Sequence, residues 1–283
     1  MRRAWTSYRL GTWLGWQVEL NWAPPAVVAL LVLLQPVSAA AILWGIYGAA
    51  GGNFASVQFT SLYLGQALYG LVGALGVGIS AAVISDRERY QTLKYLVLSP
   101  MTLPAYLAGR GTSRLVTTVA DMAILLGAGI VLFHLPFRAH DLDPGLTVLA
   151  FVLGIVLFSS LGILLAGLSF GLARSGAFIG EVAASALYLI SGTIYPVTAL
   201  PALVQPVALL SPATWWLELM RRGILGSSVQ GSAISSLPTW PTRDLLGAVG
   251  LWALGGLVLA LGFFRFMAAQ ARKRGLLERM SNG

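Results

Sequence analysis

The chain has 283 residues, of which 57% are hydrophobic and only 10% charged, and its mean hydropathy is +0.79. These values exclude a soluble globular domain and are typical of a polytopic membrane protein. The net charge of +8 does not indicate nucleic-acid binding, because the basic residues gather at the ends of apolar stretches and form no continuous face.

Residues 1–22 are predicted to form an amphipathic helix that lies on the cytoplasmic membrane surface. At about 100° per residue, Trp5, Trp13 and Trp16 fall on one face of such a helix. Simple anchoring to the membrane explains this pattern as well as packing against a partner does.

No charged residue occurs between Leu20 and Ser85, which predicts two membrane spans there, since one span needs about 20 residues. The first span covers 24–50, and Pro36 in its middle predicts a kink. The second covers 59–84. Its five glycines allow close helix packing, and they are also candidates for lining a path of variable width.

The segment 85–110 is the one long polar interruption in the first half of the chain. Its first part reads as a short amphipathic helix at the membrane surface, stopped by a proline. The residues that define this pattern are Asp86, Arg87, Glu88, Arg89, Thr92, Leu93, Leu96, Ser99 and Pro100.

Three further spans are predicted at 113–135, 144–173 and 177–194. The first holds Asp121 and the last holds Glu181, and a charge within a span is costly. The two acids either form ion pairs with Arg174 and Arg114 on neighbouring helices, or they serve a proton relay or a polar patch on a substrate path.

The segment 195–226 stays apolar but is broken by prolines into pieces too short to cross a bilayer, which predicts an outward-facing re-entrant helical hairpin. Its defining residues are Tyr195, Pro196, Pro212, Glu218 and Arg221. Glu218 precedes Arg221 and Arg222 by three and four residues, a spacing that favours ion pairs within one helix. A sixth span at 245–267 and a basic tail at 268–283 follow.

Six spans place both termini and the segment 85–110 on the same side of the membrane. Fourteen Lys and Arg residues fall on that side and four on the other. By the positive-inside rule, both termini are expected to be cytoplasmic.

Several kinds of chemistry are excluded by missing motifs. The sequence has no Gly-x-x-x-x-Gly-Lys-Ser/Thr loop to bind nucleotide phosphates and no His-Glu-x-x-His or Gly-x-Ser-x-Gly motif. It has no cysteine and only two histidines, His134 and His140, so we expect no metal site and no catalytic residue. Any ATP-driven work must use an ATPase on another chain.

Two segments resemble the permeases of type-two ABC (ABC-2) exporters. The cytoplasmic loop of that family carries four residue pairs, present here as Arg87-Glu88, Thr92-Leu93, Ser99-Pro100 and Gly109-Arg110. The second segment matches with Ser191-Gly192, Tyr195-Pro196, Ser211-Pro212, Thr214, Glu218 and Arg221. Gln91 and Lys94 depart from the Gly and Glu usual in the family, and the second departure reverses a charge.

The resemblance implies a multi-pass permease of a bacterial-type inner membrane that exports an amphipathic, drug-like or lipid-linked molecule. It also implies two ATPase subunits that bind ATP and Mg²⁺, and a second permease copy in a homodimer or heterodimer. The segment from Ser85 to Pro100 would then be a coupling helix that docks on the ATPase, against the alternative of a solvated connector. A proton-coupled carrier that uses Asp121 and Glu181, and a structural subunit without transport, are the other hypotheses.

Overall fold

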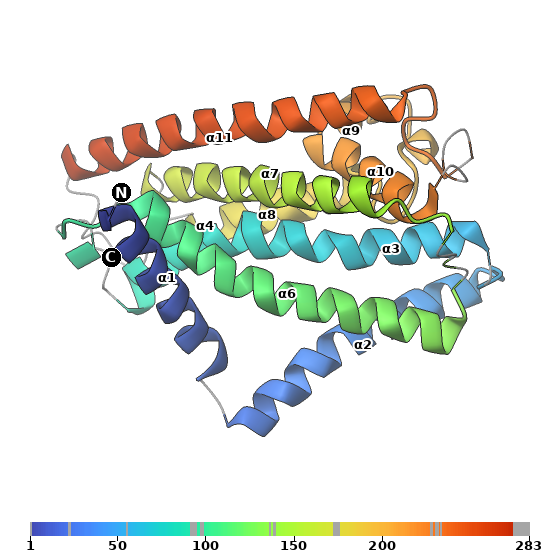
Figure 1. The fold of residues 1–283 in the computed structure, drawn as a ribbon, viewed down its shortest axis with the longest axis horizontal. Coiled ribbons are helices and arrows are strands. Elements are labelled where there is room, and N and C mark those ends of the chain that lie inside the picture. The colour runs from blue at the N-terminus through green and yellow to red at the C-terminus, as the bar shows by residue number, and fades with distance from the viewer. Residues whose placement is uncertain are drawn as a thin grey trace.

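The computed structural model describes residues 2–21, 24–54, 56–90, 95–96, 99–135, 137, 140–171, 176–226, 229, 232 and 234–273. Every regular element among these residues is a helix, which confirms the predicted all-helical fold. Most of the helices run side by side along one long axis, while α1 and α2 cross it obliquely (Figure 1).

Within the described ranges, five helical stretches are long and apolar enough to cross a membrane. They correspond to α2 (Pro25–Ala49), the continuous run from α3 (Val57–Leu71) through η2 (Ser85–Arg89), α6 (Leu103–Phe133), α7 (Pro144–Gly171) and α11 (Thr242–Lys273). Helix α2 continues through Pro36, as the predicted span requires. The tail beyond Lys273 lies outside the described residues.

The predicted fifth span, 177–194, corresponds to α8 (Gly176–Ile190), which has 15 residues. A helix of that length rises only about 22 Å, less than the hydrocarbon thickness of about 30 Å. The helix ends four residues before the predicted boundary at Ile194, since Gly192 has a φ of 77° and turns the backbone. Among the described residues, the structure therefore gives five helices long enough to span a membrane and a shorter apolar one.

The predicted start of the third span at Ser113 is wrong, because α6 begins ten residues earlier at Leu103. The sequence reads as polar there because of Arg110, but that side chain is buried and lies 3.9 Å from the Asp86 carboxylate at the end of the second span. An arginine that is paired with a carboxylate can be buried between helices, and α6 therefore continues through Arg110.

Helix α1 (Arg2–Leu20) packs along the first half of α6. The two backbones meet at glycines, and a Cβ added at Gly109 would lie 2.7 Å from the backbone nitrogen of Thr12 and would collide with the Tyr8 carbonyl oxygen. The tryptophans Trp5 and Trp13 remain exposed on the other face of α1. A helix is thus present near the predicted position, while its amphipathic character and its placement on the membrane surface stay predictions.

The second span is not a uniform α-helix. Between α3 and α4 (Gly78–Ile84) lies the π-helical segment η1 (Val72–Val77), and η2 at the end of the run is also π-helical. Such wide turns inside α-helices are frequent at functional sites.

The predicted hairpin consists of three short helices at the end of the bundle opposite η2 (Figure 1). These are η3 (Val197–Ala199), α9 (Gln205–Leu210) and α10 (Pro212–Leu225). Buried side chains of α10, including Trp216 and Leu217, join the main apolar core with residues of α3, α7 and α11. The hairpin is therefore anchored in the bundle.

Candidate transport cavities and coupling segment

Polar side chains tie the second span to α8. The Tyr188 hydroxyl donates to Gln66 Oε1 at 2.6 Å, and the Tyr69 hydroxyl donates to the Ala184 carbonyl oxygen. The rings of Tyr69 and Tyr188 meet edge to face, with centroids 4.8 Å apart. These contacts hold α8 beside the π-helical segment η1.

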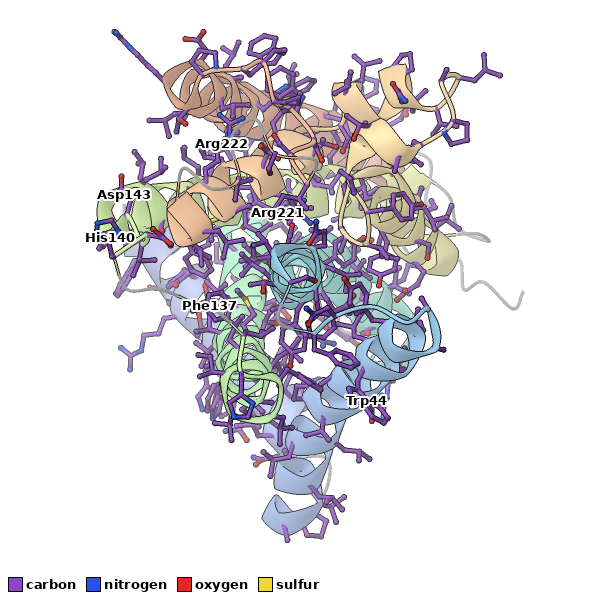
Figure 2. The ribbon with its side chains drawn as sticks, turned by 90° about the vertical axis from the view of Figure 1, so that its right-hand side faces the viewer. Trp44, Phe137, His140, Asp143, Arg221 and Arg222 are labelled. Atoms are coloured by element: carbon purple, nitrogen blue, oxygen red, sulfur yellow. The ribbon has the colours of Figure 1, made fainter. Side chains whose placement is uncertain are left out.

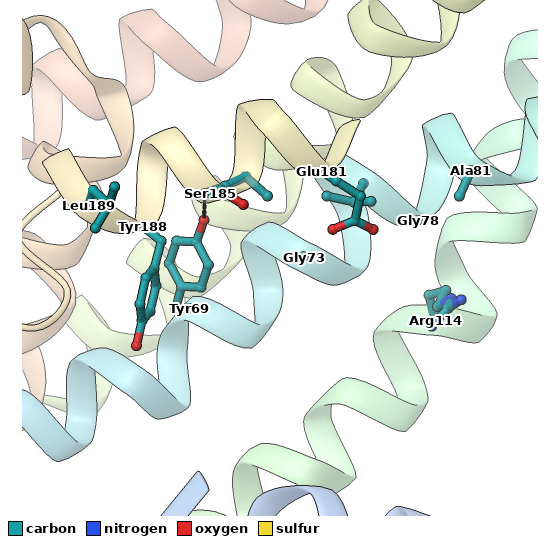
Figure 3. A pocket seen from close by; sticks show the side chains of 11 residues that line it. Tyr69, Gly73, Gly78, Ala81, Arg114, Glu181, Ser185, Tyr188 and Leu189 are labelled. Carbon is teal, nitrogen blue, oxygen red and sulfur yellow. Dashed lines mark hydrogen bonds between the residues drawn. The ribbon is translucent and has the colours of Figure 1, made fainter. Parts of the chain in front are cut away.

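A first cavity of about 560 Å³ lies between the second span, α8 and α6. Figure 3 shows Glu181 on α8 and Arg114 on α6 on different sides of this space, with Tyr69 and Tyr188 at its end. Gly73 and Val77 of η1 also line it. The π-helical segment thus forms part of the cavity wall.

A second cavity of about 340 Å³ lies between the second span, α2 and α6. Its polar lining includes Gln66, Thr117, Thr118, Asp121 and Arg114, and its apolar lining includes Pro36, Met122 and Leu125. Tyr69, Gly73 and Arg114 line both cavities. The two cavities, which we call the paired cavities, therefore adjoin each other along η1.

The predicted ion pair between Arg114 and Glu181 is absent from the structure, although both residues line the first cavity. Arg114 instead lies 2.9 Å from Glu19 on α1, which also accepts a hydrogen bond from Thr117 at 3.3 Å. Burial raises the pKa of the Glu19 carboxyl, and Arg114 opposes that rise. Sequence reasoning missed Glu19, whose only signal was an acid at the end of an otherwise basic amphipathic helix.

Asp121 lies one helical turn beyond Thr117 on the same face of α6. Its Oδ1 atom is buried and has no hydrogen-bond partner among the described residues. The alternative partner from the sequence, Arg174, lies outside the described residues. The structure therefore places both predicted acids, Asp121 and Glu181, at the paired cavities without a described ion-pair partner for either.

The coupling segment, defined here as residues 85–100, begins at the end of the second span with two inward-facing charges. The Asp86 carboxylate accepts a hydrogen bond from the Tyr106 hydroxyl at 2.8 Å. The Arg87 guanidinium donates to the Ser169 carbonyl oxygen of α7 at 2.9 Å. These bonds fix the start of the segment to α6 and α7, so Asp86 and Arg87 offer little surface to a partner.

Other residues of the coupling segment point outward. Arg89 and Pro100 are exposed, Tyr95 is 65% exposed, and Leu96 and Ser99 are half-buried. Thr92, Leu93 and the side chain of Glu88 lie outside the described residues. Contact with a partner through this segment therefore stays a prediction.

At the opposite end, a buried carboxylate joins the hairpin to the segment before α11. Glu218 Oε1 lies 3.1 Å from Arg222 Nε, and Glu218 also accepts hydrogen bonds from the Ser235 hydroxyl and the Ser236 amide. Arg222 donates to the carbonyl oxygens of Leu237 and Trp240 at 2.7 and 2.6 Å. We call this group the Glu218 clasp.

Arg221 takes a different direction from Arg222, as Figure 2 shows from this end of the bundle. It donates to the carbonyl oxygens of Gly192 and Thr193 at 2.7 and 3.1 Å. Burial lowers the pKa of Arg221 to about 10, which leaves it charged at neutral pH. Of the two predicted ion pairs with Glu218, only the one with Arg222 is present. Tyr195 is half-buried and donates to the Leu189 carbonyl oxygen at 3.0 Å.

A bundle of helices long and apolar enough to span a bilayer is the architecture of a multi-pass membrane protein. No group of three or more His, Cys, Asp or Glu side chains able to hold a metal ion occurs within the described ranges. The family model for the ABC-2 type transporter matches residues 10–225, and the chain belongs to that family. This confirms the resemblance seen in the sequence, and the matched domain is a membrane permease domain, which transports and does not catalyse.

Curated relatives agree with this family. The chain is 26% identical over 185 residues to a probable multidrug ABC transporter permease, YbhR, of Escherichia coli K12, and equally to that of the O157:H7 strain. The aligned region covers 65% of this chain and 48% of each relative. The chain therefore spans about half the length of the curated relatives it matches.

Proposed function

We propose that this chain is the transmembrane permease subunit of an ABC exporter. It moves an amphipathic, drug-like or lipid-linked molecule out of the cytoplasm or the inner leaflet. A separate ATPase subunit binds and hydrolyses Mg-ATP, and a second permease copy or a close relative completes the transporter. The description of the relatives as probable multidrug permeases supports a drug-like substrate.

The continuity of one helical run carries this proposal. The run from α3 to η2 lines both cavities at Gly73 and ends in the coupling segment. A push on the coupling segment acts on η2, and Asp86 and Arg87 transfer it to α6 and α7 through their bonds. A small rigid shift of this kind is the usual way in which a docking event changes a distant cavity.

The proposed arrangement has six crossings with α8 as the fifth, the hairpin re-entering from the outer side, and both termini in the cytoplasm. The start of α1 and the end of α11 line a common cavity through Ala4 and Ala268, which supports placing both at one end of the bundle (Figure 1). The excess of basic residues at that end supports the cytoplasmic side.

Affinity purification of the full chain from its native membranes tests the proposal. We expect a nucleotide-binding protein to co-purify and to hydrolyse Mg-ATP. Arg89→Glu, an exposed reversal in the coupling segment, should lower the amount of bound ATPase severalfold, while Arg243→Glu at the opposite end should not. Purification without any ATPase would contradict the exporter and favour the structural subunit.

A proton-coupled carrier is the second candidate, because Asp121 faces a cavity without a described partner. The variant that carries both Asp121→Asn and Glu181→Gln distinguishes the proton-coupled carrier from the ABC exporter. A proton-driven carrier loses uptake into vesicles driven by a pH gradient in this variant. An exporter shows no transport driven by a pH gradient in either form and depends on ATP.

A further inference from the structure

The charges that line the paired cavities are unusual for this chain. The whole protein carries a net charge of +8, yet within the described part of the chain the charged residues that line the cavities are two acids, Asp121 and Glu181, and one base, Arg114. Arg114 is already paired with Glu19 at 2.9 Å. When Glu19 is counted, the described surroundings of the cavities carry an excess of carboxylates.

The second cavity places Asp121 beside apolar groups and Tyr69, in a wall that also holds polar side chains and Arg114, which is paired with Glu19. Pro36, Met122 and Leu125 supply apolar surface, and Tyr69 contributes to the boundary with the first cavity. A carboxylate in such surroundings interacts strongly with a cation, because the low dielectric weakens screening. Aromatic faces add to the attraction for organic cations.

The size of the second cavity also selects a ligand class. Its volume of about 340 Å³ is at the lower end of the range for small-molecule sites, about 300–1,000 Å³. Gln66 and Thr118 provide polar atoms beside Asp121, while the apolar wall suits hydrocarbon. A compact cationic group with an apolar body fits these surroundings better than an anion or a sugar.

We propose that the second cavity binds lipophilic organic cations, with Asp121 as the counter-ion. Glu181 in the adjoining cavity supplies a second acid along the same path. The transport of these cations rests on the proposed exporter function, but their binding does not, so the two proposals can fail separately.

Binding of tetraphenylphosphonium to the full chain in lipid nanodiscs tests the inference. The cation has a permanent charge and no exchangeable proton, and tetraphenylborate provides an anion of nearly the same shape. Each is measured by equilibrium dialysis and corrected for binding to empty nanodiscs. We expect the chain to bind the cation in preference to the anion, and Asp121→Asn to weaken cation binding at least about tenfold.

Two controls keep the test specific. Asp141→Asn removes an acid outside the cavities and should leave cation binding unchanged. Asp121→Glu keeps the negative charge in the second cavity and should retain most of the cation binding. Size-exclusion profiles and thermal melting report whether each variant folds. If Asp121→Asn does not fold, the inference is tested by two other results. These are the preference of the unmodified chain for the cation over the anion and the cation binding by Asp121→Glu.

The inference is overturned if the unmodified chain binds both probes equally, or if folded Asp121→Asn binds the cation as the unmodified chain does. It is also overturned if Arg174→Gln weakens binding as much as Asp121→Asn and the double variant restores it, since Asp121 would then be a structural ion-pair partner. If any of these results is obtained but the protein still exports an uncharged substrate with ATP, the cation-binding inference fails and the proposed exporter function stands.

Discussion

At the scale of single residues, the Glu218 clasp shows how a charge is accommodated in an apolar bundle. The carboxylate of Glu218 is fully buried and receives bonds from one arginine, one serine hydroxyl and one backbone amide. Removal of one member leaves a buried charge uncompensated, which is far more costly than the pair itself is stabilising.

We therefore expect Arg222→Met to lower the free energy of unfolding by about 3–5 kcal/mol. Unfolding in mixed detergent micelles, followed by tryptophan fluorescence, measures this loss. Arg243→Met changes an exposed arginine on the neighbouring helix and should lie within about 0.5 kcal/mol of the unmodified protein. Equal stability of the two variants would mean that Glu218 finds other partners.

The sequence predicted part of this residue-level picture and missed another part. Arg222 and Glu218 are four residues apart on one helix, so their pair follows from helix geometry. The pair of Arg114 with Glu19 joins helices almost a hundred residues apart, and only the packing of α1 on α6 brings them together. Contacts of that kind depend on tertiary structure and leave no local pattern.

At the scale of helices, the packing of α1 on α6 depends on the absence of side chains at the crossing. Gly109 faces the backbone of α1 so closely that a methyl group would collide with it. Gly127, on the same helix, has no neighbour within 4 Å of an added Cβ. The two positions therefore provide a matched pair.

Gly109→Ala should destabilise the protein by about 1–3 kcal/mol, since the helices must move apart. Gly127→Ala should be neutral or stabilise it by up to about 1 kcal/mol, because Ala favours a helix over Gly. Thermal unfolding of both variants in the same detergent shows whether each substitution lowers or raises the stability of the protein. A loss in both variants would indicate a general intolerance of α6 to substitution and would contradict the close crossing.

Helix positions were largely predictable, because charge-free stretches of more than 20 residues have few alternatives to a membrane span. The early start of α6 was not, since Arg110 marks a polar segment in the sequence and only its burial beside Asp86 shows that it belongs to the helix. The π-helical turns of η1 were also unpredicted, although the glycines around Gly73 were interpreted as candidates for lining a path.

At the scale of the whole molecule, the path of the chain depends on α8. Five crossings place the two termini on opposite sides of the membrane, and six place them on the same side. Helix α8 is short and leaves Val182 and Leu189 exposed, but its other side packs against η1 and α4 of the second span. A helix that borders a cavity beside a spanning helix lies at membrane depth, and this position favours six crossings.

The chain contains no cysteine, so single cysteines can report the side of each segment without further changes. We expect Ala4→Cys and Ser281→Cys to be protected from an impermeant maleimide in intact cells and His140→Cys to be labelled. His140 suits this purpose because its side chain is 97% exposed in the loop between α6 and α7. Labelling of all three after permeabilisation confirms that each thiol is reactive. If α8 does not cross, Ser281→Cys will be labelled in intact cells together with His140→Cys, and the basic tail will then lie outside, against the positive-inside rule.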